Sequence, residues 1–216
     1  MEQFLAYSFQ EIPYVAATLI VAFTLHEFAH AYVAYKFGDP TAKNQGRLTL
    51  NPIQHLDPIG TILIFIAGFG WARPVPVNRF YFKNPRLAGI LVSVAGPLSN
   101  LFLGTVGFIV WYSLKGAGLA PSMLQEFLNI FIPLNFVLFV FNLLPLPPLD
   151  GYRVLEDLAP ADFRVKMTQF EVYGSLIFLI LVITPLNQYT IQPIFNTVLP
   201  VLLNGFNNFF YQLFMG

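Results

Sequence analysis

The clearest structural signal in the chain is the apolar stretch PYVAATLIVAFTLHEFAHAYVAYKF at residues 13–37, which contains the motif HEFAH at residues 26–30. The stretch is longer than the roughly 20 residues that a helix needs to cross the hydrocarbon core of a bilayer. Lys36 and the Gly-Asp-Pro sequence at residues 38–40 form a helix-stop signal at its end. The stretch therefore predicts a transmembrane helix that carries three ionisable side chains in its apolar interior.

The composition of the whole chain indicates the same class of protein. Of its 216 residues, 56% are hydrophobic and only 10% are charged, whereas a soluble globular chain has about 25% charged residues. The 11 Lys and Arg residues are balanced by 11 Asp and Glu residues, so no basic surface for nucleic acid is expected. The absence of cysteine excludes disulfides, thiolate metal sites and cysteine nucleophiles, and it leaves nitrogen and oxygen atoms as ligands for any metal.

Further apolar stretches follow the first one, at residues 87–114, 127–149, 171–186 and 191–214. Together with the first, they predict an all-α polytopic membrane protein of about five transmembrane helices. The whole of residues 1–216 is expected to form a single domain.

The connection between the first two predicted spans is polar and rich in Gly and Pro. Alternating residues at Arg47–Leu50 and Val75–Val77 predict two short strands, and hence a small membrane-associated β-sheet. Between them, residues 59–69 are apolar, but about 11 residues are too few to cross a bilayer. They predict a re-entrant segment or a short packing helix, and Asp57 before Pro58 is expected to cap its first turn.

The distribution of Lys and Arg predicts the orientation in the membrane. Residues 36–86 and the loop at 150–170 carry almost all of these residues, whereas the alternate connections carry only Lys115. The positive-inside rule then places the N-terminus outside and both basic regions in the cytoplasm, and with five spans it places the last residues in the cytoplasm too. The HEFAH motif precedes Lys36 by one to three helical turns, so the site is expected in the cytoplasmic half of the cell membrane.

The spacing within HEFAH is suited to metal chemistry. His26 and His30 project from one face of a helix about one turn apart, so both imidazoles can bind one metal ion. Glu27 lies about 60° around the helix from His30 and reaches a metal-bound water without being a ligand. Zinc lowers the pKa of such a water, and the carboxylate takes its proton. The alternative, ordinary polar residues on a buried face, is disfavoured because ionisable groups inside a span are costly.

Two histidines leave a catalytic zinc one protein ligand short. Asp150 is a candidate because it follows the third span, and an unwound segment at the prolines of residues 145–148 can fold it back toward the histidines. Its alternative role is to cap the helix that starts at Gly151. His55 and Asp57 are the other candidates for the third ligand. For Asp57 the role of a helix cap is favoured over that of a ligand. For His55 the roles of a hydrogen-bond donor behind a metal ligand, a substrate contact and a turn residue are also open.

Several motifs, in order along most of the chain, resemble those of the site-2 protease family of intramembrane zinc metalloproteases. They are HEFAH, GDPTAKNQGRLTLNP at 38–52, HLDPIGT at 55–61, AGPLSN at 95–100 and NLLPLPPLDG at 142–151. No inserted PDZ-like domain or nucleotide-sensing domain is recognisable, so the resemblance is to a minimal form of the family.

The resemblance implies one Zn²⁺ per chain, bound by His26, His30 and Asp150, with Glu27 as the catalytic acid and base. It also makes Asn142 a candidate for positioning the substrate or stabilising the oxyanion, although an interhelical hydrogen bond is an equal alternative. Asn100 in AGPLSN has the same two roles open, with helix packing favoured.

The predicted function is that of an intramembrane zinc endopeptidase acting on transmembrane segments of other membrane proteins, with the lipid bilayer as its surroundings. An extended substrate is expected to pair with the strand edge at Arg47, Leu48, Thr49 and Leu50. The alternative hypothesis is a membrane metal transporter or metal-binding protein that uses the same His and Asp residues.

Overall fold

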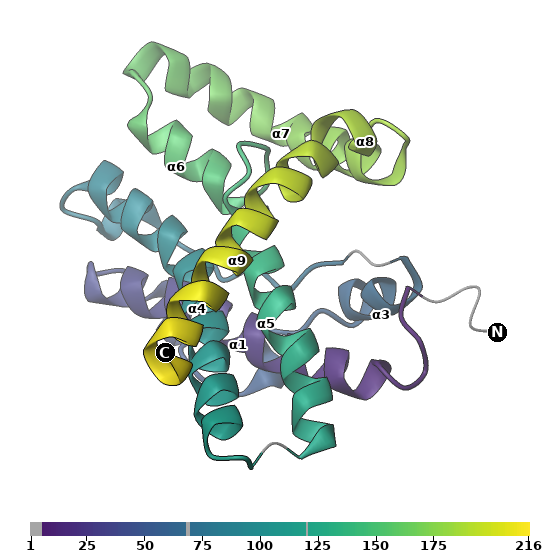
Figure 1. The fold of residues 1–216 in the computed structure, drawn as a ribbon. Coiled ribbons are helices and arrows are strands. Elements are labelled where there is room, and N and C mark those ends of the chain that lie inside the picture. The colour runs from purple at the N-terminus through teal and green to yellow at the C-terminus, as the bar shows by residue number, and fades with distance from the viewer. Residues whose placement is uncertain (1–5, 68–69, 120) are drawn as a thin grey trace.

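The computed structural model describes residues 6–67, 70–119 and 121–216, and Figure 1 shows their arrangement. The helices in chain order are α1 (Ile12–Lys36), α2 (Thr41–Asn44), α3 (Pro58–Ala67), α4 (Pro85–Gly116), α5 (Ser122–Asn142), α6 (Asp150–Leu158), α7 (Ala161–Ile183), α8 (Asn187–Thr190) and α9 (Gln192–Met215). Short 3-10 helices, η2 (Pro52–Gln54) and η3 (Arg79–Tyr81), lie in the connection between α1 and α4.

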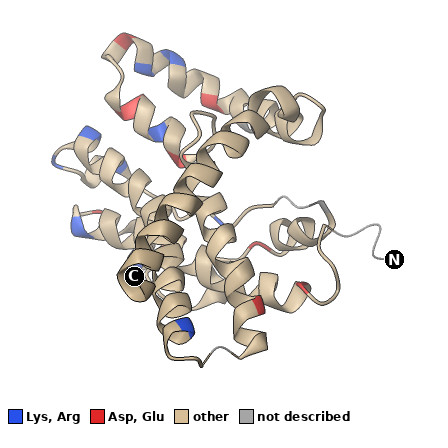
Figure 2. Ribbon diagram, viewed as in Figure 1, with Lys and Arg blue, Asp and Glu red and all other residues tan. Residues whose placement is uncertain are grey.

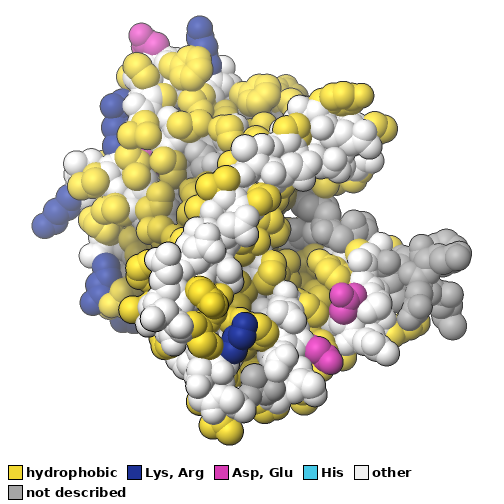
Figure 3. Space-filling view, in the orientation of Figure 1, with side chains coloured by type: hydrophobic (Ala, Val, Ile, Leu, Met, Phe, Trp, Pro, Cys, Tyr) yellow, Lys and Arg dark blue, Asp and Glu magenta, His cyan; other side chains and the backbone are white. Residues whose placement is uncertain are grey.

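Three helices, α1, α4 and α5, are each long and apolar enough to cross a membrane among the described residues. Helix α7 also qualifies if its two halves, which are bent by 56° at a short break, count as one span. Figure 3 shows hydrophobic side chains spread over the visible face, with few charged groups among them. The chain is therefore a multi-pass membrane protein.

Helix α4 is the centre of the bundle and packs against both α1 and α5. Its contact with α5 is close because Gly104 and Gly107 present no side chain there. A Cβ at Gly104 would lie 2.6 Å from the Phe136 ring, and one at Gly107 would lie 2.6 Å from Ile132. Small residues at such positions let helix backbones approach and gain packing energy in a membrane.

The predicted β-sheet is wrong for the part of the chain that the structure describes. That part has no strand between α1 and α4 and only one isolated bridge, between Leu56 and Ala72. Leu48 and Thr49 form a bend, and Pro76 interrupts the second predicted strand because proline lacks the N–H that a ladder requires.

The connection between α1 and α4 nevertheless runs along the side of the bundle toward the start of α1 and returns. The carboxylate of Asp39, fully buried, accepts the Thr41 N–H at the start of the connection and the Asn78 N–H near its end. Between these points, Ile64 of α3 packs against Val15 near the start of α1. Of the predicted element, Gly68 and Phe69 lie outside the described residues.

The two ends of the bundle differ in charge, as Figure 2 shows. We call them the Lys36 end, where α1 ends and α4 begins, and the Tyr14 end, where α1 begins. The Tyr14 end is identified by a hydrogen bond from the Tyr14 hydroxyl to Glu126 near the start of α5. Most Lys and Arg residues lie toward the Lys36 end, on α2, η3, the start of α4, α6 and α7.

The expectation of five spans is not met, and the last helix runs the other way from the one predicted. Leu144 and Leu149, which follow α5, cluster with Phe178 of α7 and with Ile191 just before α9. The chain from α5 to α9 therefore makes no net crossing of the bundle. Helix α9 then runs along α4 and α5 until Met215 lies beside Gly116 (Figure 1).

This path places the end of α9 at the Tyr14 end, whereas the sequence analysis placed it with the basic loops. The reason is that α7 bends instead of crossing directly. Helix α9 itself does not qualify as a span by hydropathy, because it carries several side-chain amides, at Asn196, Asn204, Asn207, Asn208 and Gln212.

Candidate metal centre

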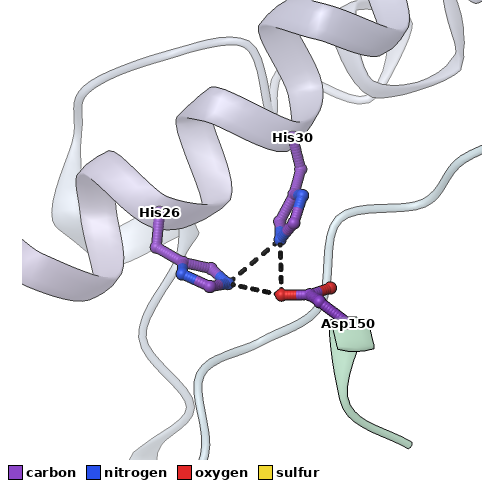
Figure 4. Close-up of side chains that lie close together, drawn as sticks. All are labelled: His26, His30 and Asp150. Carbon is purple, nitrogen blue, oxygen red and sulfur yellow. Dashed lines mark hydrogen bonds and ion pairs between the residues drawn. The ribbon is translucent and has the colours of Figure 1, made fainter. Parts of the chain in front are cut away.

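Two imidazoles of α1 turn their Nε2 atoms toward a common point (Figure 4). His26 and His30 are both buried, and their Nε2 atoms are 3.0 Å apart. The i, i+4 spacing on a regular helix produces this arrangement, because residues four apart lie on one face.

Asp150, the first residue of α6, joins the pair from a distant part of the chain (Figure 4). Its Oδ2 is 3.2 Å from His26 Nε2 and 3.3 Å from His30 Nε2. Helix α5 ends at Asn142, and the proline-rich turn that follows folds the chain back to the histidines. Gly151 permits this, since a Cβ there would lie 2.2 Å from the Leu143 carbonyl oxygen.

Hydrogen bonds on the far side of each ring show which nitrogen carries the proton. His30 Nδ1 is 2.7 Å from the Val92 carbonyl oxygen, which can only accept, so Nδ1 is the donor. His26 Nδ1 is 2.8 Å from Asn100 Oδ1. Both Nε2 atoms therefore turn lone pairs toward each other and toward the Asp150 carboxylate. Such an arrangement of acceptors is repulsive unless a cation lies between them.

The donor set fits zinc. Zinc binds histidine nitrogen and carboxylate oxygen at about 2.0–2.2 Å, so ligand atoms in a tetrahedral site lie about 3.3–3.5 Å apart. The three separations of 3.0, 3.2 and 3.3 Å are close to that spacing. Three protein ligands with an open fourth position are typical of a catalytic zinc site.

Gly96 on α4 provides the space for a metal, a role that the sequence analysis missed. A Cβ at this position would lie 2.3 Å from His30 Nε2 and 2.6 Å from His26 Nε2. The glycine of AGPLSN was the available signal, but its neighbours in space are not evident from the sequence.

Glu27 is buried beside the cluster and is oriented by the backbone. Its Oε2 accepts a 2.8 Å hydrogen bond from the Val75 N–H. Glu27 lines the same cavity of about 460 Å³ as His26, His30 and Asp150. The other walls of the cavity are mainly apolar and come from α4, α5, α7, residues 70–77 and the segment around Asp150.

The structure brings only some of the other predicted residues to this cavity. Asn142 lines it, although its Nδ2 donates to Leu138 of its own helix. His55 is fully buried away from the cavity and donates from Nε2 to the Thr49 carbonyl oxygen at 2.7 Å. Asp57 Oδ1 accepts the Gly60 N–H, which confirms the predicted cap of α3.

Residues 47–50 do not lie at the cavity, but Arg47 acts on it indirectly. Its buried guanidinium donates to the carbonyl oxygens of Arg73 and Pro74, at 2.6 and 3.2 Å. These two residues precede Val75, which binds Glu27. Sequence reasoning missed this link because it depends on backbone atoms, which carry no residue signature.

The far end of α6 is held by a buried carboxylate, that of Asp157. Its Oδ1 binds Arg79 of η3 and, at 3.1 Å, Arg164 of α7. Burial raises the pKa of the Asp157 carboxyl, while the two arginines act to lower it. A Cβ at Gly89 would lie 2.1 Å from Asp157 Oδ2, so glycine is required for this approach of α6 to α4.

Comparison with known proteins agrees with the metal chemistry of the site. The model of Peptidase family M50 matches residues 113–184. The chain is 57% identical to the Bacillus subtilis (strain 168) protein named "Putative zinc metalloprotease YwhC", over 99% of this chain and 100% of the relative.

More distant relatives carry names of the same kind. A Mycolicibacterium smegmatis protein named "Putative zinc metalloprotease Rip2" is 31% identical over 84% of this chain and 71% of its own length. No solved structure gives a significant match to the chain. Because the chain is 57% identical to such a relative over nearly the whole length of both proteins, it belongs to peptidase family M50, the site-2 protease family, and is a zinc metalloprotease.

Proposed function

We propose that the protein is an intramembrane zinc endopeptidase that hydrolyses peptide bonds within transmembrane segments of membrane-protein substrates. The observation that carries the proposal is the convergence of His26, His30 and Asp150 beside Glu27 in a mainly apolar cavity. In this proposal, residues 1–216 form one domain that binds one zinc ion.

Each residue of the cluster has a specific role in this proposal. His26, His30 and Asp150 hold the metal. Zinc, when bound, supplies a Lewis acid that polarises the scissile carbonyl group and acidifies water. Glu27 accepts a proton from the attacking water and delivers it to the leaving amine. The Val75 N–H holds the Glu27 carboxylate in place for both transfers.

The surroundings of the site support a substrate that lies within the bilayer. The cavity is bounded by α1 and α5, both long and apolar enough to cross a membrane. Asn142 lines it, and we propose that this amide contacts the substrate backbone. Residues 47–50 are not suited to pair with an extended substrate, because Leu48 and Thr49 form a bend and Arg47 binds residues 73–74.

We further propose that the Lys36 end faces the cytoplasm and the Tyr14 end faces outward. The support is the concentration of Lys and Arg toward the Lys36 end (Figure 2). Basic residues near the ends of spans are retained on the cytoplasmic side. The metal centre then lies toward the cytoplasm of the cell membrane.

The test compares purified wild-type protein with Glu27→Gln for zinc content and for cleavage of a transmembrane peptide. Glu27→Gln should retain zinc and lose about 10²–10⁴-fold in cleavage rate, since loss of a general base has effects of that size. Glu126→Gln is the matched control, because Glu126 pairs with Tyr14 away from the cavity, and it should retain activity. Undiminished cleavage by Glu27→Gln would contradict the proposal, and metal flux without proteolysis would indicate a transporter.

A further inference from the structure

Two buried asparagines connect the backbone of α5 to a ligand of the metal centre. Asn100 of α4 and Asn135 of α5 are both fully buried. Asn135 Nδ2 lies 2.9 Å from the Phe131 carbonyl oxygen, and Asn135 Oδ1 lies 3.3 Å from Asn100 Nδ2. Asn100 Oδ1 then lies 2.8 Å from His26 Nδ1.

The direction of this hydrogen-bond chain is fixed at its start. A backbone carbonyl oxygen can only accept, so Asn135 must turn its Nδ2 toward Phe131 and its Oδ1 toward Asn100. Asn100 Nδ2 is also 3.4 Å from the Ala22 carbonyl oxygen, a second group that can only accept. Asn100 is thereby left with its Oδ1 facing His26, which must carry its proton on Nδ1.

Both histidines donate a hydrogen bond from Nδ1, but their acceptors differ in kind. His30 donates to the Val92 carbonyl oxygen, which belongs to the backbone of α4 and cannot exchange acceptor for donor. An amide can turn over by 180° and present its NH₂ group instead. Asn100 therefore requires a second partner that prevents this rotation, and Asn135 is placed to provide it.

We propose that Asn100 and Asn135 are positioning residues that hold His26 in the Nδ1–H tautomer, with its Nε2 lone pair directed at the metal. Asn100 acts on His26 directly, and Asn135 acts only through Asn100. The proposal rests on the metal centre described above, and it assigns the asparagine of AGPLSN a role beyond helix packing.

The first experiment measures zinc affinity by competition with a chelator in detergent-purified protein. Asn100→Leu removes the acceptor for His26 and should weaken zinc binding about 10–100-fold, the effect usual for partners of metal ligands. Asn100→Asp still offers an oxygen to the Nδ1–H group and should retain much tighter binding than Asn100→Leu. Equal losses in these two variants would overturn the proposal.

The second experiment tests the order of the chain. Asn135→Leu frees the Asn100 amide to turn over, so it should weaken zinc binding less than Asn100→Leu does. The double variant should bind zinc no more weakly than Asn100→Leu alone, because Asn135 has no separate route to His26. Additive losses would show two independent packing effects. If Asn100→Leu does not fold, wild-type affinity in Asn135→Leu would still contradict the proposal.

The third measurement reads the tautomer itself. With only three histidines in the chain, ¹⁵N-histidine labelling resolves individual rings. In zinc-loaded wild-type protein, His26 should carry its proton on Nδ1 and bind the metal through Nε2, and Asn135→Leu should give a mixture of this form and others. A mixture already present in the wild-type protein would contradict the proposal.

A control variant separates positioning from packing. The Tyr112 hydroxyl donates to Asn207 Oδ1 at 2.7 Å and joins α4 to α9 away from the metal. Tyr112→Phe should lower thermal stability without changing zinc affinity. A separate variant tests whether His26 binds the metal at all. If His26→Ala bound zinc as the wild type does, the metal centre itself would be wrong, whatever the role of the two asparagines.

Discussion

Gly96 lies directly against both imidazoles of the metal centre, so its missing side chain is a functional property. In Gly96→Ala the added methyl group would lie within 2.3 Å of His30 Nε2, where the lone pair must reach the metal. We expect zinc content to fall at least about tenfold, because ligand displacements of this size exceed the tolerance of zinc sites. Elemental analysis of purified protein measures this.

Gly205 on α9 gives the matched control for that substitution, because a Cβ there would meet no atom within 4 Å. Gly205→Ala should bind zinc as the wild type does. If Gly96→Ala also retained full zinc content, the histidines would have to move aside, and the described geometry would not be the one that binds metal.

At the scale of residues, the sequence predicted the cluster because its chemistry depends on side-chain types, which the sequence gives directly. Ionisable groups within an apolar stretch are costly, and the prolines before Asp150 indicated a break that brings it back to the histidines. Gly96, the Val75 N–H and the partners of Asn100 could not be predicted in this way. Their roles depend on which backbone and side-chain atoms meet in space.

At the scale of elements, α6 is a short helix that is fixed at both ends. Its first residue, Asp150, belongs to the metal centre, and Asp157 near its end binds Arg79 and Arg164. Asp157→Asn should lower the free energy of unfolding by about 2 kcal/mol. This is less than the 3–5 kcal/mol typical of a fully buried pair, because the two arginines remain partly exposed. Thermal or denaturant unfolding in detergent measures this loss.

Glu171→Gln is the control for that loss, because Glu171 of α7 pairs with Arg153 of α6 at 3.7 Å and both side chains are partly exposed. It should cost less than about 1 kcal/mol, as exposed ion pairs do. Equal effects of the two substitutions would mean that Asp157 does not anchor α6.

The elements differ in how well the sequence predicted them. Long apolar stretches correctly predicted α1, α4 and α5, because length and hydropathy are local properties. The strand at residues 47–50 was wrong because its alternation reflects the burial of Arg47 against residues 73–74, a contact between distant segments. The last helix runs opposite to the expected direction because α7 bends between Gly174 and Leu176, and a single glycine within an apolar stretch does not by itself predict such a bend.

At the scale of the whole molecule, the path of α9 predicts that the end of this helix lies on the same side of the membrane as the start of α5. The chain contains no cysteine, so single cysteines can be labelled without background. Ser122 begins α5 at the Tyr14 end, Gln212 lies near the end of α9, and Lys83 lies at the Lys36 end. In intact cells, a membrane-impermeant maleimide should label Ser122→Cys and Gln212→Cys alike and should not label Lys83→Cys.

Permeabilised cells provide the control for this labelling, since all three cysteines should then react. If Ser122→Cys were labelled in intact cells while Gln212→Cys stayed as unreactive as Lys83→Cys, the result would support an odd number of crossings and would contradict the path of α9. The readout depends on helix direction alone, so it is independent of catalysis and of zinc.

The ligands of the metal centre come from the first and the sixth helix, which are far apart in the sequence. A bound ion therefore acts as a reversible cross-link between the two halves of the polypeptide, and closing so long a loop restricts the unfolded chain strongly. Zinc supply would then govern how long the protein survives in the cell as well as how fast it works. Starvation for the metal would expose the untethered halves to cellular quality control.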